Sequence, residues 1–187
     1  MEKKSIEDLS NLVFGLALTL GAVTLVRPES NDFVQLFAIL LNFGLGFFII
    51  VWIWWLYNRM TKGLDMDRKT EVILNCILLF LVVIEPYLWT LTTTSSGATM
   101  YALDLGTALL ILGAFSHLTI QKAKKKREDV KRQIFGRNVA FACALVFYLS
   151  IIPGLIPEFQ PYGVQGLIWL SVLMISVLSR FRRERGK

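Results

Sequence analysis

The feature that most constrains this chain is a series of six long apolar runs, which together occupy most of its 187 residues. A helix that crosses a bilayer needs about 20 mostly apolar residues. Hydrocarbon offers backbone groups no partners, so a spanning segment is either a helix or a strand of a closed barrel. Barrel strands alternate with period two, and these unbroken runs do not. We therefore expect an all-α, polytopic membrane protein with six transmembrane helices. The helices are predicted at about 9–26, 33–57, 72–91, 98–120, 138–156 and 162–179, in a single domain of residues 1–187.

Composition agrees with this fold class and argues against catalysis. Hydrophobic residues make up 55% of the chain and charged residues 18%, whereas a soluble domain has about 45–50% and about 25%. One histidine is too few for a clustered metal site, and neither a Walker-type glycine loop nor a dinucleotide fingerprint is present. Cys76 and Cys143 lie within predicted helices, where we expect them to be buried by packing. We expect no enzyme activity, no metal site and no cofactor.

The basic residues fall almost entirely on one side of the predicted helices, and only Arg27 lies on the other. By the positive-inside rule, both termini are cytoplasmic, which agrees with an even number of crossings. The densest basic segment is 121–137. In a membrane protein such a segment attracts anionic lipid head groups, so we expect lipid contacts there and no nucleic-acid partner. A noncatalytic scaffold that binds a partner protein through this segment is an alternative.

Two acidic residues, Glu85 and Asp104, lie within predicted helices, where a charge is costly unless it is paired or hydrated. Glu85 precedes Pro86 near the outer end of its helix, which favours interfacial hydration over attraction of cations at an outer mouth. Asp104 is predicted to pair with another helix; lining a vestibule and carrying protons are the alternatives.

The first apolar run carries a stripe of residues that share one helical face, because residues three and four apart lie together. Its members are Leu12, Leu16, Thr19, Leu20 and Val23. Such a stripe is typical of helix packing, and also of a pore wall that closes by dewetting at an apolar ring. Spacing alone favours packing.

The stretch LSNLVFGLALTL resembles the first-helix signature F-S-D-G-V-F-A-I-A-I-T-L-L of the endolysosomal potassium channel family, transmembrane protein 175 and its prokaryotic relatives. Matching positions there are Ser10, Val13, Phe14, Ala17, Thr19 and Leu20, and Pro28 closes the segment. The second and third predicted helices are also similar to the family pattern, at Trp54, Arg59, Arg68, Asn75, Leu79 and Pro86. The last three predicted helices agree only in length, topology and apolar character.

The resemblance implies a potassium-preferring cation channel in a prokaryotic plasma membrane, with one six-helix repeat in each chain of a homotetramer. The first helix would line the central pore, with Leu16 as the constriction and Leu12, Thr19, Leu20 and Val23 as further pore positions. Potassium ions would be the permeant species. The Thr19 hydroxyl would help to replace the hydration water of the cation.

The chain departs from the family pattern on the cytoplasmic side. Asn11 stands where the signature has an acid, the expected arginine falls at Ser5, and the paired histidines fall at Tyr57 and Asn58. We predict a neutral polar network around Ser5, Ser10, Asn11 and Asn58. The alternative function is a small secondary transporter or proton-coupled carrier that uses Asp104 and Glu85.

Overall fold

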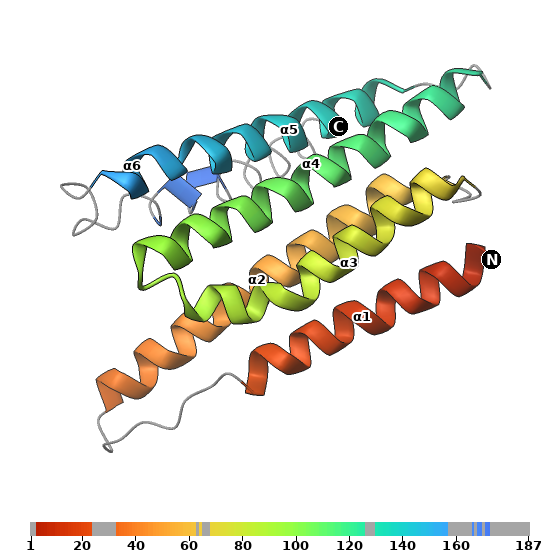
Figure 1. The fold of residues 1–187 in the computed structure, drawn as a ribbon. Coiled ribbons are helices and arrows are strands. Elements are labelled where there is room, and N and C mark those ends of the chain that lie inside the picture. The colour runs from red at the N-terminus through yellow and green to blue at the C-terminus, as the bar shows by residue number, and fades with distance from the viewer. Residues whose placement is uncertain are drawn as a thin grey trace, which may run out of the picture.

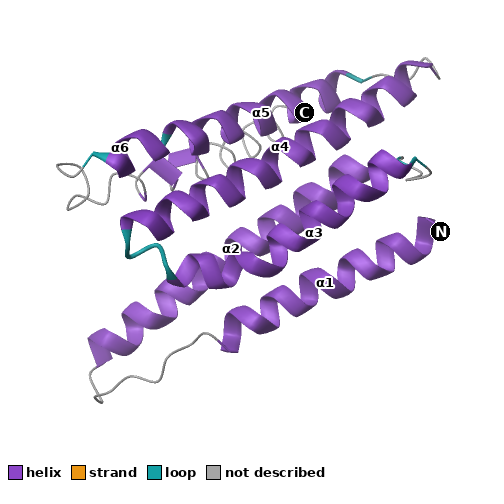
Figure 2. Cartoon of the chain, viewed as in Figure 1, coloured by secondary structure: helices purple, strands orange, loops and turns teal. Residues whose placement is uncertain are grey.

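The structure is a computed structural model that describes residues 3–23, 33–62, 64, 68–125, 130–156, 166, 168–169 and 171–172. Within these residues the regular elements are helices: α1 (Lys3–Val23), α2 (Phe33–Thr61), α3 (Lys69–Thr90), α4 (Ser95–Lys125), α5 (Lys131–Leu149) and α6 (Ile151–Leu155). Figure 2 shows these helices, with a short described loop between α3 and α4. The expectation of an all-α chain is confirmed over the described residues.

Five of the described segments are long and apolar enough to cross a membrane, namely Lys4–Val23, Ile39–Thr61, Lys69–Thr90, Ser95–Lys124 and Gln133–Pro153. The chain is thus a multi-pass membrane protein. The sixth predicted helix, 162–179, falls largely outside the described residues. A six-helix count and cytoplasmic termini therefore stay predictions.

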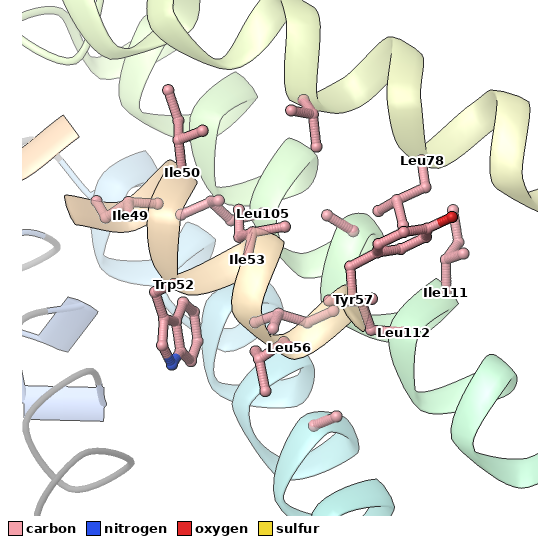
Figure 3. Close-up of a cluster of buried hydrophobic side chains, with 14 of the residues drawn as sticks. Ile49, Ile50, Trp52, Ile53, Leu56, Tyr57, Leu78, Leu105, Ile111 and Leu112 are labelled. Atoms are coloured by element: carbon pink, nitrogen blue, oxygen red, sulfur yellow. The ribbon is translucent and has the colours of Figure 1, made fainter. Parts of the chain in front are cut away.

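Helix α4 lies at the centre of the bundle, with α5 along one side and α2 and α3 along the other (Figure 1), and α1 packs on α3 and α2. In the most apolar part of α4, 67% of the residues are buried, against 28–33% in the other four candidate spans. Side chains from α2, α3 and α4 form the main core, where Ile53, Leu78 and Leu105 are almost inaccessible (Figure 3). The four outer helices instead leave much of their apolar surface free for lipid or for another copy of the chain.

Several predicted boundaries are wrong at the basic end of the bundle. Helix α4 continues to Lys125 and α5 begins at Lys131, so most of the 121–137 segment is helical and not a loop. Lysine and arginine are good helix formers, and the apolar pattern detects only the part of a helix that lies in the bilayer. At the opposite end of α5, the predicted fifth helix, 138–156, is interrupted at Ser150, where α5 gives way to the short α6.

Close approach of α2 and α3 depends on one glycine. A Cβ atom at Gly46 would lie 3.2 Å from Trp89 Cδ1, whereas a Cβ at Gly44 would meet nothing within 4 Å. The indole Nε1 of Trp89 also donates a hydrogen bond to the Asn42 carbonyl oxygen (3.1 Å). The indole thus fills the space that Gly46 leaves.

The two cysteines differ in their surroundings. Cys143 is buried, as expected, but Cys76 is exposed on α3. The prediction that packing buries Cys76 is wrong, because α3 turns that face away from the described helices.

Candidate functional site

Helix α1 has one face packed against the chain and one face left open. Ile6, Ser10, Phe14 and Ala17 are buried. The predicted stripe lies on the other side: 70% of Leu12, 51% of Leu16, 37% of Leu20 and 77% of Val23 is exposed. Packing within the described part of the chain therefore does not account for this apolar stripe, which is available to lipid or to another copy.

Thr19 is also exposed, and its hydroxyl donates a hydrogen bond to the Gly15 carbonyl oxygen one turn earlier (2.9 Å). Because the hydroxyl proton is used within the helix, the lone pairs of the oxygen point outward. An oxygen in this state can accept a hydrogen bond or coordinate a cation. Thr19 thus supplies the polar position on an otherwise apolar face.

The buried face of α1 is fixed by a polar cluster of Ser10, Tyr57 and Asn75, which are 0%, 2% and 3% exposed. The Ser10 hydroxyl donates to the Ile6 carbonyl oxygen (2.8 Å). Since its single proton is used there, the Tyr57 hydroxyl, 2.8 Å away, must donate to Ser10 Oγ. Asn75 Nδ2 also lies 3.3 Å from this oxygen and donates to it. The cluster thus joins α1, α2 and α3.

Asn11 and Asn58 lie outside that cluster, and both contact Trp54. The Trp54 indole Nε1 donates to Asn11 Oδ1 (3.0 Å), and Asn58 Nδ2 donates to the Trp54 carbonyl oxygen (3.0 Å). Ser5 is exposed near the start of α1. Of the four residues predicted to form a network, the structure brings Ser10 into the buried cluster and places Asn11 and Asn58 beside Trp54.

Sequence reasoning missed the role of Tyr57, which it named only as a position where the family pattern has a histidine and left out of the predicted polar network. A signal was available: Ile50, Ile53 and Tyr57 share one helical face, and this face is buried (Figure 3). A buried tyrosine hydroxyl normally has a hydrogen-bond partner. The spacing therefore pointed to a hydrogen-bonded core tyrosine.

We predict that Tyr57→Phe lowers the free energy of unfolding by about 1 kcal/mol, because Ser10 Oγ loses a buried donor. The measurement is the apparent melting temperature of purified protein in detergent. Tyr87→Phe is the matched control, since Tyr87 is 63% exposed on α3, and we expect it to melt like the wild-type chain. Equal melting of the two variants would contradict a structural role for the Tyr57 hydroxyl.

The two intramembrane acids lie between α3 and α4. Glu85 is fully buried, and the Tyr101 hydroxyl donates a hydrogen bond to its Oε1 (3.0 Å). Asp104 is 5% exposed, one helical turn after Tyr101. Hydration of Glu85 stays a prediction: Tyr101 satisfies one carboxyl oxygen inside the protein, and Oε2 has no hydrogen-bond partner among the described residues. Pairing of Asp104 stays a prediction, because its Oδ1 has no hydrogen-bond partner among the described residues.

Part of the basic segment 121–137 is used within the chain. Lys122 Nζ lies 3.6 Å from Oε1 of the buried Glu71, which ties α4 to α3. Arg137 contacts Asn138 and His117 through its guanidinium nitrogens. The ion pair with Glu71 offsets the charge that Lys122 could offer to lipid head groups, whereas the partners of Arg137 are not acidic and do not offset its charge.

Comparison with known proteins agrees with this arrangement. Residues 5–86, which contain α2 and most of α1 and α3, match the model of a family described as the endosomal/lysosomal potassium channel TMEM175. The fold is similar to that of a variant of the potassium channel MtTMEM175, seen in a crystal structure of its complex with a nanobody–MBP fusion protein. That similarity has a TM-score of 0.61 at 18% sequence identity, and covers 96% of this chain and 93% of that chain. A search of curated proteins gave no match.

Proposed function

We propose that the chain is a member of the TMEM175 family, whose model matches residues 5–86, and that it forms a potassium-preferring cation channel. The observation that carries the proposal is the division of α1. One face holds the helix to the rest of the chain through buried residues, and the other presents Leu12, Leu16, Thr19, Leu20 and Val23 outside the described core.

In the proposed assembly, four chains surround an axis and each contributes its α1 to the pore wall. The exposed stripe then faces the axis, and the Leu16 side chains form the narrowest ring. A narrow apolar ring excludes water and blocks ions, whereas a slightly wider one admits both. Permeation is passive and follows the electrochemical gradient.

Selectivity in this proposal is modest, because the stripe holds few oxygen atoms that could replace the hydration shell of an ion. Thr19 supplies one oxygen from each chain. Its hydroxyl proton is already donated to Gly15, so its lone pairs are the groups that face the cation. Four such oxygens in a ring would favour a weakly hydrated cation.

The Ser10–Tyr57–Asn75 cluster holds the buried face of α1, opposite the stripe, to α2 and α3. Its three hydrogen-bonding side chains carry no charge, unlike the acid, arginine and histidines that the family pattern places in this region. We propose that the cluster holds the cytoplasmic half of α1 against α2 and α3, so that opening moves the helix about this support.

The function is tested with purified protein in liposomes that contain potassium and are diluted into a medium in which a large organic cation replaces it. Potassium efflux through a channel makes the interior negative. Protons then enter when a protonophore is added, and a pH-sensitive dye reports them. We expect a signal that requires both the protein and the protonophore.

The same assay separates the alternatives. A proton-coupled carrier that uses the buried acids Glu85 and Asp104 would move protons without the protonophore. Such a result would contradict the channel. A scaffold would give no signal under either condition. The proposed tetramer is tested separately by the mass of the detergent-solubilised assembly, and the contact of the 121–137 segment with anionic lipid by vesicle binding.

A further inference from the structure

A cavity of about 220 Å³ lies between α1, α2 and α3. It is at the end of the bundle where α1 and α3 finish and α2 begins (Figure 1). Its wall includes Gly21 of α1, Asn42, Phe43 and Phe47 of α2, and Glu85 and Trp89 of α3. The cavity is smaller than the sites of drug-sized ligands, which measure about 300–1,000 Å³, so it is suited to a molecule with a single ring.

Glu85 is the one ionisable side chain on the described wall of this cavity. The residue is fully buried, and only one of its carboxyl oxygens is satisfied, by Tyr101. The other oxygen, Oε2, is buried and has no hydrogen-bond partner among the described residues. An unpaired buried carboxyl oxygen is costly. Because the Glu85 side chain has no accessible surface in this structure, a cationic donor in the cavity reaches Oε2 by displacing the side chains that cover it, and the resulting pair would offset that cost.

Aromatic rings line the same space. Phe43 and Phe47 lie with ring centroids 6.0 Å apart. Trp89 is held by its hydrogen bond to the Asn42 carbonyl oxygen and by its ring contact with Tyr101, at 5.2 Å between centroids. Aromatic faces attract organic cations, whereas a hard metal ion prefers several charged or carbonyl oxygen ligands, and the described wall carries a single carboxyl group.

We propose that this cavity binds a small organic ammonium ion. Its nitrogen lies toward the Glu85 carboxyl group, and its apolar body lies against Phe43, Phe47 and Trp89. The cavity is close to the helix ends, and amphiphilic amines concentrate at the membrane interface, so the ligand reaches it from the head-group region. Binding does not depend on the channel function proposed above, and its test uses no measurement of flux.

The probe is para-trifluoromethyl-benzylamine, which is cationic at neutral pH, and its binding to purified protein in detergent is followed by fluorine NMR. The neutral isostere is para-trifluoromethyl-benzyl alcohol. We expect saturable binding of the amine and binding of the alcohol at least about tenfold weaker, because only the amine forms a charge-assisted hydrogen bond. Equal affinities would overturn the proposal.

Two variants locate the site. Glu85→Gln keeps the shape of the side chain and removes its charge, and we expect it to weaken amine binding at least about tenfold. Asp104→Asn is the matched control, since Asp104 is also buried but does not line the cavity; we expect it to bind like the wild-type chain. Unchanged amine affinity in Glu85→Gln would overturn the proposal.

Gly21→Leu tests the cavity without altering the carboxyl group. A Cβ at Gly21 makes only ordinary contacts, at 3.8 Å to Phe43 and Pro86, so the larger side chain fills free space. We expect it to abolish amine binding. If the amine binds Gly21→Leu as tightly as it binds the wild-type chain, it occupies another place, such as the pore, and the proposal is wrong. This variant decides the matter even if Glu85→Gln does not fold.

Discussion

Leu16→Ala is expected to raise potassium conductance several-fold and to weaken the preference for potassium over sodium. In the proposed tetramer, four Leu16 side chains form the narrowest apolar ring of the pore. Removal of their branched ends widens the ring, so that water remains in it and the barrier to ion entry falls. Because ions then pass with more of their hydration shell, the Thr19 hydroxyls discriminate between them less.

The measurement is single-channel conductance and reversal potential in planar bilayers. Leu145→Ala on α5 is the matched control, because Leu145 is 58% exposed and Leu16 is 51% exposed. We expect the control to conduct like the wild-type protein, since α5 lies on the far side of α4 from α1. If Leu16→Ala leaves conductance unchanged while a substitution on another helix alters it, α1 is not the pore helix.

The sequence predicted the helical class and the positions of the first five spans, because a spanning helix in lipid must be long, apolar and continuous. It did not predict where α4 and α5 end near Lys125 and Lys131. The last helical turn of α4 and the first turns of α5 extend beyond the apolar part of each helix. Their lysine and arginine side chains do not contribute to the apolar pattern from which the helices were predicted. Hydropathy reports the bilayer-facing length of a helix, and helix propensity decides the remainder.

The site was predicted less completely than the fold, for a different reason. Periodicity identified the residues of the α1 stripe, although spacing alone favoured packing over exposure. The partners of buried polar groups depend on which helices become neighbours. Tyr57 lies 47 positions after Ser10, and Asn75 lies 65 positions after it. Glu85 is likewise paired with Tyr101 on the next helix. A single sequence does not record such pairings, so the sequence did not predict the Tyr101 partner of Glu85 or a place for Tyr57 in the polar cluster.

Gly97→Ala is expected to lower the free energy of unfolding by about 2 kcal/mol or more, as overpacking does where the surroundings cannot yield. Gly97 is buried in the first turn of α4, and its amide donates a hydrogen bond to the Thr94 hydroxyl (3.1 Å), which caps the helix. A Cβ at this position would overlap the backbone carbonyl of Leu91. Because the obstacle is backbone, no side-chain rotation relieves it, and the turn between α3 and α4 must shift.

Gly136→Ala provides the control with the opposite sign. A Cβ at Gly136 in α5 would meet nothing within 4 Å, and alanine is preferred to glycine inside a helix by about 0.5–1 kcal/mol. We therefore expect Gly136→Ala to raise the apparent melting temperature in detergent and Gly97→Ala to lower it. In Gly97→Ala, the shifted turn would also move Tyr101 relative to Glu85. The loss of stability and the disturbance of the Tyr101–Glu85 hydrogen bond would then have the same cause. Stabilisation by both substitutions would show that the turn accepts a side chain at Gly97, and the close packing of Gly97 against Leu91 would then be wrong.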